Sequence, residues 1–212
     1  MAWREARPLP SEFYARGSVS LARLLLGRVL VRREGRRLLA GRIVELEAYR
    51  GSSDPASHAY RGPTPRNRVM FGPAGHGYVY FTYGMHHCLN VVAAREGVAE
   101  AVLLRALEPL AGLESMRERR GDVADMRLMR GPGCVAQALG LTRADDGVDL
   151  VTGALWIAAV AAERGGRRVA SGPRIGIRVG VESPWRFWLA GHPAVSGPRG
   201  VGAERPRGRV PR

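Results

Sequence analysis

The sequence predicts an α+β fold, a single domain in which strand pairs form a mostly antiparallel sheet flanked by a few helices. Apolar runs with strand character are separated by short turns, as in antiparallel pairs. Helical stretches between them carry start and stop signals. No internal repeat or linker divides the 212 residues, a length that suits one domain with its own core.

Turn and cap residues define the elements of the first half. Serines cap the first helix and Gly27 ends it. A turn near Gly35 joins the first two strands. Thr64 as cap and Pro65 at the first helical position fit the start of a second helix. The expected elements are a helix over 18–27, strands over 28–34 and 38–49, a helix within 64–71, and a hairpin over 78–93 that turns at Gly84.

In the second half, Pro109 ends a buried strand and Pro132 lies near the start of a helix. The expected elements are a strand over 101–109, helices over 110–121 and 131–141, and strands over 153–162, 173–181 and 186–191. Residues 197–212 are rich in Gly, Pro and Arg, so we expect a basic, disordered tail after a domain over 1–196.

The net charge of the chain limits the kinds of molecule that it is expected to bind. The net charge is +14 and all 33 basic residues are arginines, so a polyanion is favoured, either nucleic acid or an acidic membrane surface. Two cysteines are too few for a disulfide framework or a four-cysteine zinc site. The longest apolar run is too short to span a bilayer and no signal peptide begins the chain. We expect a soluble, intracellular protein, cytoplasmic and associated with the nucleoid.

The stretch "RIVELEAY" places two carboxylates on one face of a strand. Glu45, Glu47 and Tyr49 share that face, and the other face, which suits a core, holds Val44, Leu46 and Ala48. Two interpretations are open. Charged sheet faces are usually solvated and paired with arginine, and this pattern alone favours that interpretation. The alternative is a functional site.

Two histidine motifs are weaker. A lone histidine such as His58 is more often a packed or surface residue than a catalytic one. The run His86–Cys88 suggests a metal site, but adjacent strand residues point to opposite faces and make a poor set of ligands. We expect no metal and no cofactor.

Several motifs agree in order and spacing with one family. The stretches "GRIVELEAY", "SHAYRGPTPRNRVMF", "GYVYFTYGMHHCLN", "VLLRALEP", "SGPRIGI" and "PWRFWLAGHPAVS" resemble the alkyladenine (3-methyladenine) DNA glycosylase family over about residues 20–196. The resemblance implies a curved sheet with a protruding β-hairpin that inserts into DNA. It also implies a monofunctional enzyme of base excision repair. Such an enzyme flips damaged purines such as 3-methyladenine, hypoxanthine and ethenoadenine out of the duplex, and hydrolyses their N-glycosidic bond with activated water.

The resemblance also implies roles. Glu47, not Glu45, matches the general base, Arg105 helps to hold the attacking water, and the backbone carbonyl of Ile175 contacts that water. The implied base-pocket residues are Tyr49, His58, Tyr80 and Asn90, the last of which discriminates against guanine. The implied intercalating residues at the hairpin tip are Tyr83 and Met85. Such wedges offset an unstacking cost of roughly a few kcal/mol per base step.

His86 and His87 depart from the family, whose characterised members carry aromatic residues beside the wedge. Their grip on DNA could weaken as the imidazoles lose charge with rising pH. The hairpin register follows from parity: Tyr80 and Asn90 face one pocket if they oppose each other, with Gly84, Met85 and His86 as the loop.

Two other functions compete with a glycosylase that acts as a monomer on double-stranded DNA. One is a nucleic-acid binder without catalysis, which would not need a carboxylate such as Glu47 pointed at DNA beside Arg105. The other is a basic membrane-surface protein, which the scattered arginines do not favour, since no amphipathic basic helix stands out.

Overall fold

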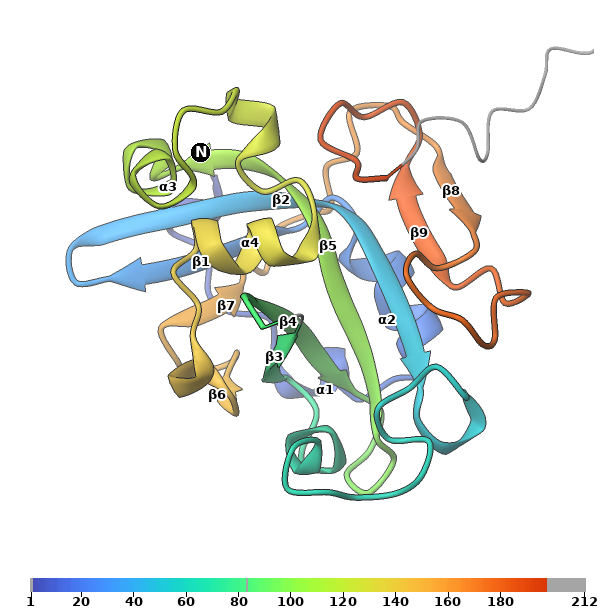
Figure 1. Ribbon diagram of the computed structural model, residues 1–212. Helices are drawn as coiled ribbons and strands as arrows, with labels where there is room; N and C mark the ends of the chain where they lie inside the picture. Colours follow the sequence, from blue (N-terminus) through green and yellow to red (C-terminus); the bar gives the residue numbers. More distant parts are fainter. Residues whose placement is uncertain (1, 83, 198–212) are drawn as a thin grey trace, which may run out of the picture.

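A computed structural model describes residues 2–82 and 84–197 of the chain. Its strands form one antiparallel sheet in the order β6-β3-β4-β5-β2-β1-β7, with β9 paired to β2 and β8 paired to β9 (Figure 1). The strands are β1 Val29–Glu34, β2 Arg37–Arg50, β3 His76–Thr82, β4 His86–Ala93, β5 Glu100–Ala111, β6 Val148–Asp149, β7 Leu155–Ile157, β8 Val169–Gly172 and β9 Arg186–Leu189.

The two long strands β2 and β5 run side by side through the molecule and organise the sheet (Figure 1). β2 pairs with β5 along one edge, and along its other edge first with β1 and then with β9. The predicted core face of β2 is confirmed, because Val44, Leu46 and Ala48 all belong to the main hydrophobic core. The α+β class and the mostly antiparallel, curved sheet are therefore confirmed.

The described residues form four short α-helices, two of which, α2 and α4, pack against the sheet. α2 lies against β2 and β5, whereas α4 lies against β4 and β5 and contacts α3. The α-helices are α1 Ser11–Tyr14, α2 Ser18–Leu25, α3 Leu113–Arg120 and α4 Pro132–Ala138, and the 3₁₀ turns are Ala2–Arg4, Gly51–Ser53, Arg68–Phe71, Asp125–Arg127 and Arg143–Asp145.

The start of α2 differs from its prediction and its end does not. The cap residue is Gly17, without a side-chain cap. The Glu100 carboxylate supplies the missing acceptor, taking hydrogen bonds from the Ser18 amide at 2.6 Å and the Ser18 hydroxyl at 2.7 Å. Gly27 ends the helix as predicted, with a φ of 87° that few other residues adopt.

The helix predicted within 64–71 is wrong. Turns lead instead into the 3₁₀ turn at Arg68–Phe71. The Asn67 side chain explains this, because its Oδ1 accepts from the Thr64 amide while its Nδ2 donates to the His58 and Gly62 carbonyls. A side chain that bonds the backbone around it competes with helix formation.

Two predicted strands are also wrong in extent. Only Leu155–Ile157 of the segment 153–162 forms a strand, and the segment 173–181 is a loop between β8 and β9. Gly176 and Gly180 adopt φ values of 80° and 64° there, which interrupts an extended chain. The loop instead buries Arg174 beneath the sheet surface.

Pro109 does not end β5, which continues to Ala111. Pro109 lies opposite Gly41 beside an irregularity in the β2–β5 pairing. β4 pairs only with Glu100–Leu103 of β5, so no hydrogen bond to β4 is lost because Pro109 has no amide hydrogen. A strand tolerates proline where no amide is needed.

The register of the β3–β4 hairpin differs from the predicted one, but Tyr80 and Asn90 still face the same side. Tyr80 pairs with Cys88, Tyr78 pairs with Asn90, and the ladder ends at the pair Thr82 and His86. The predicted pairing of Tyr80 with Asn90 is therefore wrong by two residues. Because side chains alternate with a period of two, a shift of two leaves both residues on one face.

Two further predictions, the role of Tyr83 and the basic tail over 197–212, concern residues that the structure mostly does not describe. Tyr83 lies outside the described residues, as does all of the predicted tail except Gly197. In the described part of the chain, no helix has the length and apolar character needed to cross a membrane.

Candidate active site

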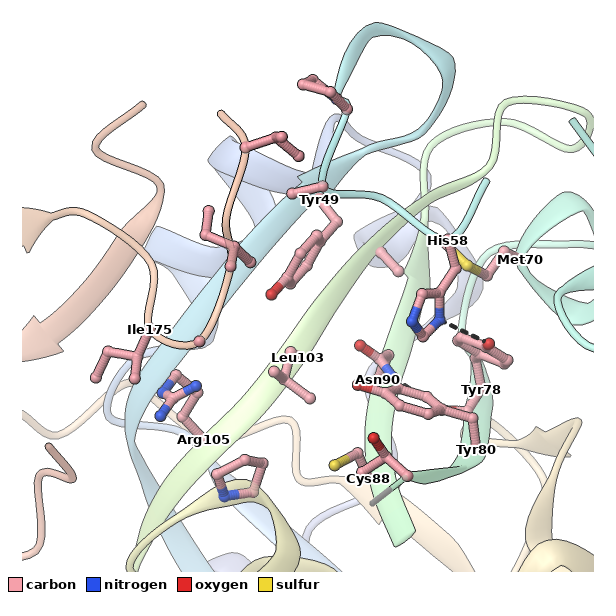
Figure 2. A pocket seen from close by; sticks show the side chains of 18 of the residues that line it. Tyr49, His58, Met70, Tyr78, Tyr80, Cys88, Asn90, Leu103, Arg105 and Ile175 are labelled. Carbon is pink, nitrogen blue, oxygen red and sulfur yellow. Dashed lines mark hydrogen bonds between the residues drawn. The ribbon is translucent and has the colours of Figure 1, made fainter. Parts of the chain in front are cut away.

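A cavity of about 530 Å³ lies over the β2–β5 face, between the β3–β4 hairpin, the loop after β8 and the start of α4 (Figures 1 and 2). It brings together residues predicted from distant parts of the sequence. Its walls include Tyr49, His58, Tyr80, Asn90, Arg105 and Ile175, all of them predicted, and also Tyr78, Cys88, Leu103, Pro132 and Arg178.

Glu47 lies directly behind this wall. Its carboxylate is fully buried and is held by three groups that line the cavity. The Ile175 amide donates to Oε1 at 2.7 Å, the Tyr49 hydroxyl donates to Oε2 at 2.9 Å, and Nη1 of Arg105 lies 3.2 Å from Oε1. Strand β2 therefore delivers a carboxylate to the cavity wall.

Burial raises the pKa of Glu47 above its ordinary value, and the Arg105 charge and the hydrogen bonds from Ile175 and Tyr49 oppose that rise. A carboxylate with a raised pKa is a stronger base than an exposed one. The contacts with Arg105, Ile175 and Tyr49 stabilise the ionised carboxylate of Glu47, which is the form that can accept a proton. The arrangement suits general-base chemistry.

Glu45 is also fully buried, so the solvated sheet face that the pattern alone favoured is wrong. Its Oε1 accepts from Nε of Arg105 at 3.1 Å and from Nε of Arg186 at 2.7 Å. The Ser196 amide donates to its Oε2 at 2.6 Å. Glu45 is thus saturated by protein donors and does not line the cavity.

Tyr49 stands on one side of the cavity (Figure 2). The guanidinium of Arg174 lies over the Tyr49 ring, 4.6 Å from its centre. Arg174 is fixed by Asp54, whose Oδ1 accepts from Nη2 at 2.8 Å, and by the Ala48 carbonyl. Both side chains of this ion pair are fully buried. The pair fastens the loop that carries Ile175 to the strand that carries Glu47.

An aromatic cluster forms the opposite side (Figure 2). The rings of Tyr78 and Tyr80 stack with centres 5.3 Å apart, and the His58 ring meets Tyr80 edge-on at 4.6 Å. Nδ1 of His58 and the Tyr78 hydroxyl are 3.0 Å apart. Burial, with a contribution from the Arg66 charge, lowers the pKa of His58, so the imidazole is neutral near pH 7. Burial raises the pKa of Tyr78 to about 12, so its hydroxyl keeps its proton.

Asn90 lies on the floor of this side and is only 4% exposed. Its Nδ2 donates to the Tyr78 carbonyl at 3.1 Å. Asn90 therefore does two things at once, since it satisfies a backbone group of the hairpin and forms part of the cavity wall.

The free end of the hairpin carries large apolar side chains in water. Met85 is 71% exposed and Phe81 is 45% exposed. The Phe81 ring lies 5.1 Å from the His87 ring, and Arg66 donates to the Phe81 carbonyl at 3.2 Å. An exposed apolar tip with a cation at its base suits contact with stacked bases and phosphate.

No metal centre is evident within residues 2–82 and 84–197, which hold no group of three or more His, Cys, Asp or Glu side chains close enough to bind an ion. Cys88 lines the cavity as a free thiol. Burial raises its pKa, so it remains protonated and is a poor nucleophile.

Sequence reasoning missed Tyr78, Arg174 and Asp54. The sequence does contain a signal for Tyr78, because it lies two residues before Tyr80 and therefore shares its strand face. Arg174 directly precedes Ile175, but no local pattern connects it with Asp54, 120 residues away in sequence. Only the folded chain brings that pair together.

Comparisons with known proteins identify the family of this chain. A family model described as "Methylpurine-DNA glycosylase (MPG)" matches residues 12–193. A protein of Burkholderia lata is 51% identical over 194 residues, which cover 90% of this chain and 91% of that protein. A protein of Methanoculleus marisnigri is 50% identical over 191 residues, which cover 89% of this chain and 98% of that protein. Both carry the name "Putative 3-methyladenine DNA glycosylase". The chain belongs to the methylpurine-DNA glycosylase family, a family of DNA-repair enzymes.

Proposed function

We propose that this chain is a monofunctional DNA glycosylase that removes methylated or deaminated purines, such as 3-methyladenine, hypoxanthine and ethenoadenine, from double-stranded DNA. The observation that carries the proposal is the Glu47 carboxylate, buried behind the wall of a cavity lined by aromatic rings. A pure DNA binder needs neither the carboxylate nor the arginine that holds it.

The cavity suits a flipped purine. Tyr80 and Tyr49 flank it from β3 and β2 (Figure 2), and stacking on an aromatic side chain is worth roughly 1–3 kcal/mol per base. The neutral His58 ring keeps one nitrogen engaged with Tyr78 and offers the other to the edge of the base. Asn90 contacts the base from below.

Hydrolysis then follows from the groups around Glu47. As the bond between C1′ and the base nitrogen breaks, its electron pair leaves with the base and positive charge builds on the sugar. Water bonds to C1′ and gives its proton to Glu47. Arg105 and the carbonyl of Ile175 hold that water. A cationic base such as 3-methyladenine leaves as a neutral molecule and needs no acid.

The hairpin tip supports extrusion of the nucleotide. Tyr83 and Met85 enter the minor groove and fill the gap that the flipped nucleotide leaves. The exposed Met85 side chain is consistent with this role.

The test is base release from duplexes that carry one hypoxanthine, ethenoadenine or 3-methyladenine. We expect abasic sites with the wild-type protein and none with Glu47→Gln, which keeps the shape and removes the base. Lesion binding by Glu47→Gln is expected to stay within a few-fold of wild type. Release by Glu47→Gln at the wild-type rate, or no release from any lesion by the wild type, would overturn the proposal.

A further inference from the structure

A buried ion network lies immediately behind the catalytic wall. Arg105 is the link, because it contacts both carboxylates of β2: its Nε lies 3.1 Å from Glu45 and its Nη1 lies 3.2 Å from Glu47. The β2–β5 pairing is irregular at this point, and Arg105 has no partner in the ladder. The Gly131 amide still holds its backbone carbonyl at 3.0 Å, and the direction of its guanidinium is set by the groups that the side chain contacts.

Glu45 anchors Arg105 directly and also through Ser196. Besides binding Nε of Arg105 directly, it accepts the Ser196 amide at 2.6 Å. The Ser196 hydroxyl in turn accepts from Nη2 of Arg105 at 3.3 Å. Arg186 closes the network, donating to Glu45 at 2.7 Å and to the Ser196 carbonyl at 2.8 Å.

The same network presses the segment 192–197 against the cavity wall. Gly197 approaches Ile175 so closely that a Cβ at residue 197 would lie 2.6 Å from the Ile175 Cδ1 atom, and its φ of 81° also favours glycine. Ile175 is the residue whose amide holds Glu47. Glu45 thus reaches Glu47 by two routes, one through Arg105 and one through Ser196 and Ile175.

We propose that Glu45 is a positioning residue for the reaction, which fixes Arg105 and the segment 192–197 so that both hold Glu47 in its working geometry. This inference rests on the proposed role of Glu47 as the base. It predicts an effect on the chemical step and not on DNA binding, since the carboxylate of Glu45 contacts only buried groups of the protein, from Arg105, Arg186 and Ser196.

The dependence of base release on pH distinguishes two roles of Glu45: positioning Arg105, or only repelling the charge of Glu47. Charged or titratable groups face Glu47 from every side: Arg105, Glu45, Tyr49, Arg174, Tyr80 and Cys88. The Arg105 charge lowers the pKa of Glu47 more than the Glu45 charge raises it. If Glu45 positions Arg105, its removal raises the pKa of Glu47. If Glu45 is only a neighbouring charge, its removal lowers that pKa.

The experiment uses Glu45→Gln/Arg186→Gln, which removes one charge of each sign and leaves Arg105 with Glu47. The matched control is Glu34→Gln, because Glu34 also lies between two arginines, at 3.2 Å from Arg32 and 2.6 Å from Arg119, away from the cavity. Single-turnover release of hypoxanthine is measured against pH with saturating enzyme, and lesion affinity is measured in parallel.

We expect the double variant to release base on the order of 10- to 100-fold more slowly at neutral pH, as small misplacements of catalytic groups do. Its acid limb moves to higher pH and its DNA affinity stays within twofold. The control keeps the wild-type profile. A double variant with the wild-type rate, or with an acid limb moved to lower pH, would overturn the inference.

Glu45→Asp covers the case in which the double variant does not fold, because it keeps the buried charge and withdraws the carboxylate from Arg105, Arg186 and the Ser196 amide. A wild-type rate and pH profile for Glu45→Asp would equally overturn the inference. Wild-type protein and Glu47→Gln are assayed alongside. Failure of the wild type to release base would sink the proposed function, whereas normal Glu45 variants beside an inactive Glu47→Gln would sink this inference alone.

Discussion

The Ile175 amide donates a hydrogen bond of 2.7 Å to Glu47, so a loop between β8 and β9 is tied to the carboxylate at the heart of the site. The residue before Ile175 secures the loop, since Arg174 is bound by Asp54 and lies under the Tyr49 ring. The geometry of Glu47 therefore depends on an ion pair that touches neither the carboxylate nor the cavity opening.

Arg174→Met tests how much that ion pair contributes to the stability of the fold. It leaves Asp54 as an unpaired buried charge, and breaking a buried pair in this way costs about 3–5 kcal/mol of stability. Urea unfolding of the wild type, Arg174→Met, Asp54→Asn and the double variant gives the coupling. We expect the double variant to be more stable than Arg174→Met. A loss below about 1 kcal/mol in Arg174→Met would match an ordinary surface pair and contradict the prediction.

Glu47 is expected to set the acid limb of the pH profile of base release. Burial raises its pKa above the value of about 4.3 for an exposed glutamate. Because only the ionised form accepts a proton from water, release is expected to rise with pH as Glu47 ionises, with a midpoint above that of an ordinary glutamate. Single-turnover rates with saturating enzyme isolate this limb from any change in DNA binding with pH.

The raised pKa of Glu47 also makes the stability of the protein depend on pH. A carboxyl whose pKa is raised on folding binds its proton more tightly in the folded state. Its contribution to stability is fully present below the pKa of the unfolded chain and is lost as pH rises through the folded pKa. Glu47→Gln removes that dependence. A Glu47→Gln variant whose stability varies with pH as the wild type does would place the shift elsewhere.

Strand parity is the part of the site that the sequence alone predicts well. Alternation in β2 assigns Val44 and Leu46 to the core and Glu47 to the other face. Parity does not predict register, so Tyr80 was placed opposite Asn90 instead of Cys88. A slip by two residues preserves every face, and only the turn geometry distinguishes the alternatives.

The loops were harder to predict because distant side chains shape them. The run 173–181 has strand character, but it forms a loop in which Arg174 pairs with the distant Asp54 and Gly176 and Gly180 adopt positive φ. Asn67 bonds the Thr64 amide and the His58 and Gly62 carbonyls, which ties it to the loop before the predicted helix. The contact between Arg174 and Asp54 spans 120 residues and lies outside any local window of sequence, whereas propensity is a local quantity.

Tyr83→Ala and Met85→Ala are expected to impair flipping more than nonspecific binding, because phosphate contacts supply most nonspecific affinity. Stopped-flow fluorescence of an ethenoadenine duplex reports the flipping step. Met126→Ala is a matched control, since Met126 is also exposed, at 38%, but lies in a 3₁₀ turn outside the hairpin. An unchanged flipping equilibrium in both hairpin variants would remove the wedge role.

The product is expected to be an intact abasic strand. Strand nicking by a bifunctional glycosylase runs through a Schiff base with an amine, and this chain has no lysine to form one. The N-terminal amine is the remaining candidate. Denaturing gels should show cleavage only after alkali treatment. A covalent protein–DNA adduct trapped by borohydride would contradict this expectation.

Asn90→Ser is expected to gain excision of guanine. Guanine carries an exocyclic amino group at its minor-groove edge that adenine-derived bases and hypoxanthine lack. The Asn90 side chain is pinned by its bond to the Tyr78 carbonyl and cannot turn away, so that amino group collides with it or goes unpaired. Serine is smaller and accepts a hydrogen bond from the amino group. The gain should be clearest at a mismatch, where flipping costs less.

The bond to Tyr78 also defines the alternative, in which Asn90 only satisfies the hairpin backbone. Its loss would then destabilise the protein by about 1–3 kcal/mol, the cost of an unsatisfied buried group, without a change in selectivity. The ratio of single-turnover rates for hypoxanthine and mismatched guanine distinguishes the two roles, with folding checked by thermal melting. Rejection by a clash requires that ratio to fall in Asn90→Ser, because only the guanine rate is released. A folded variant with an unchanged ratio would show that selectivity against guanine is set elsewhere in the cavity.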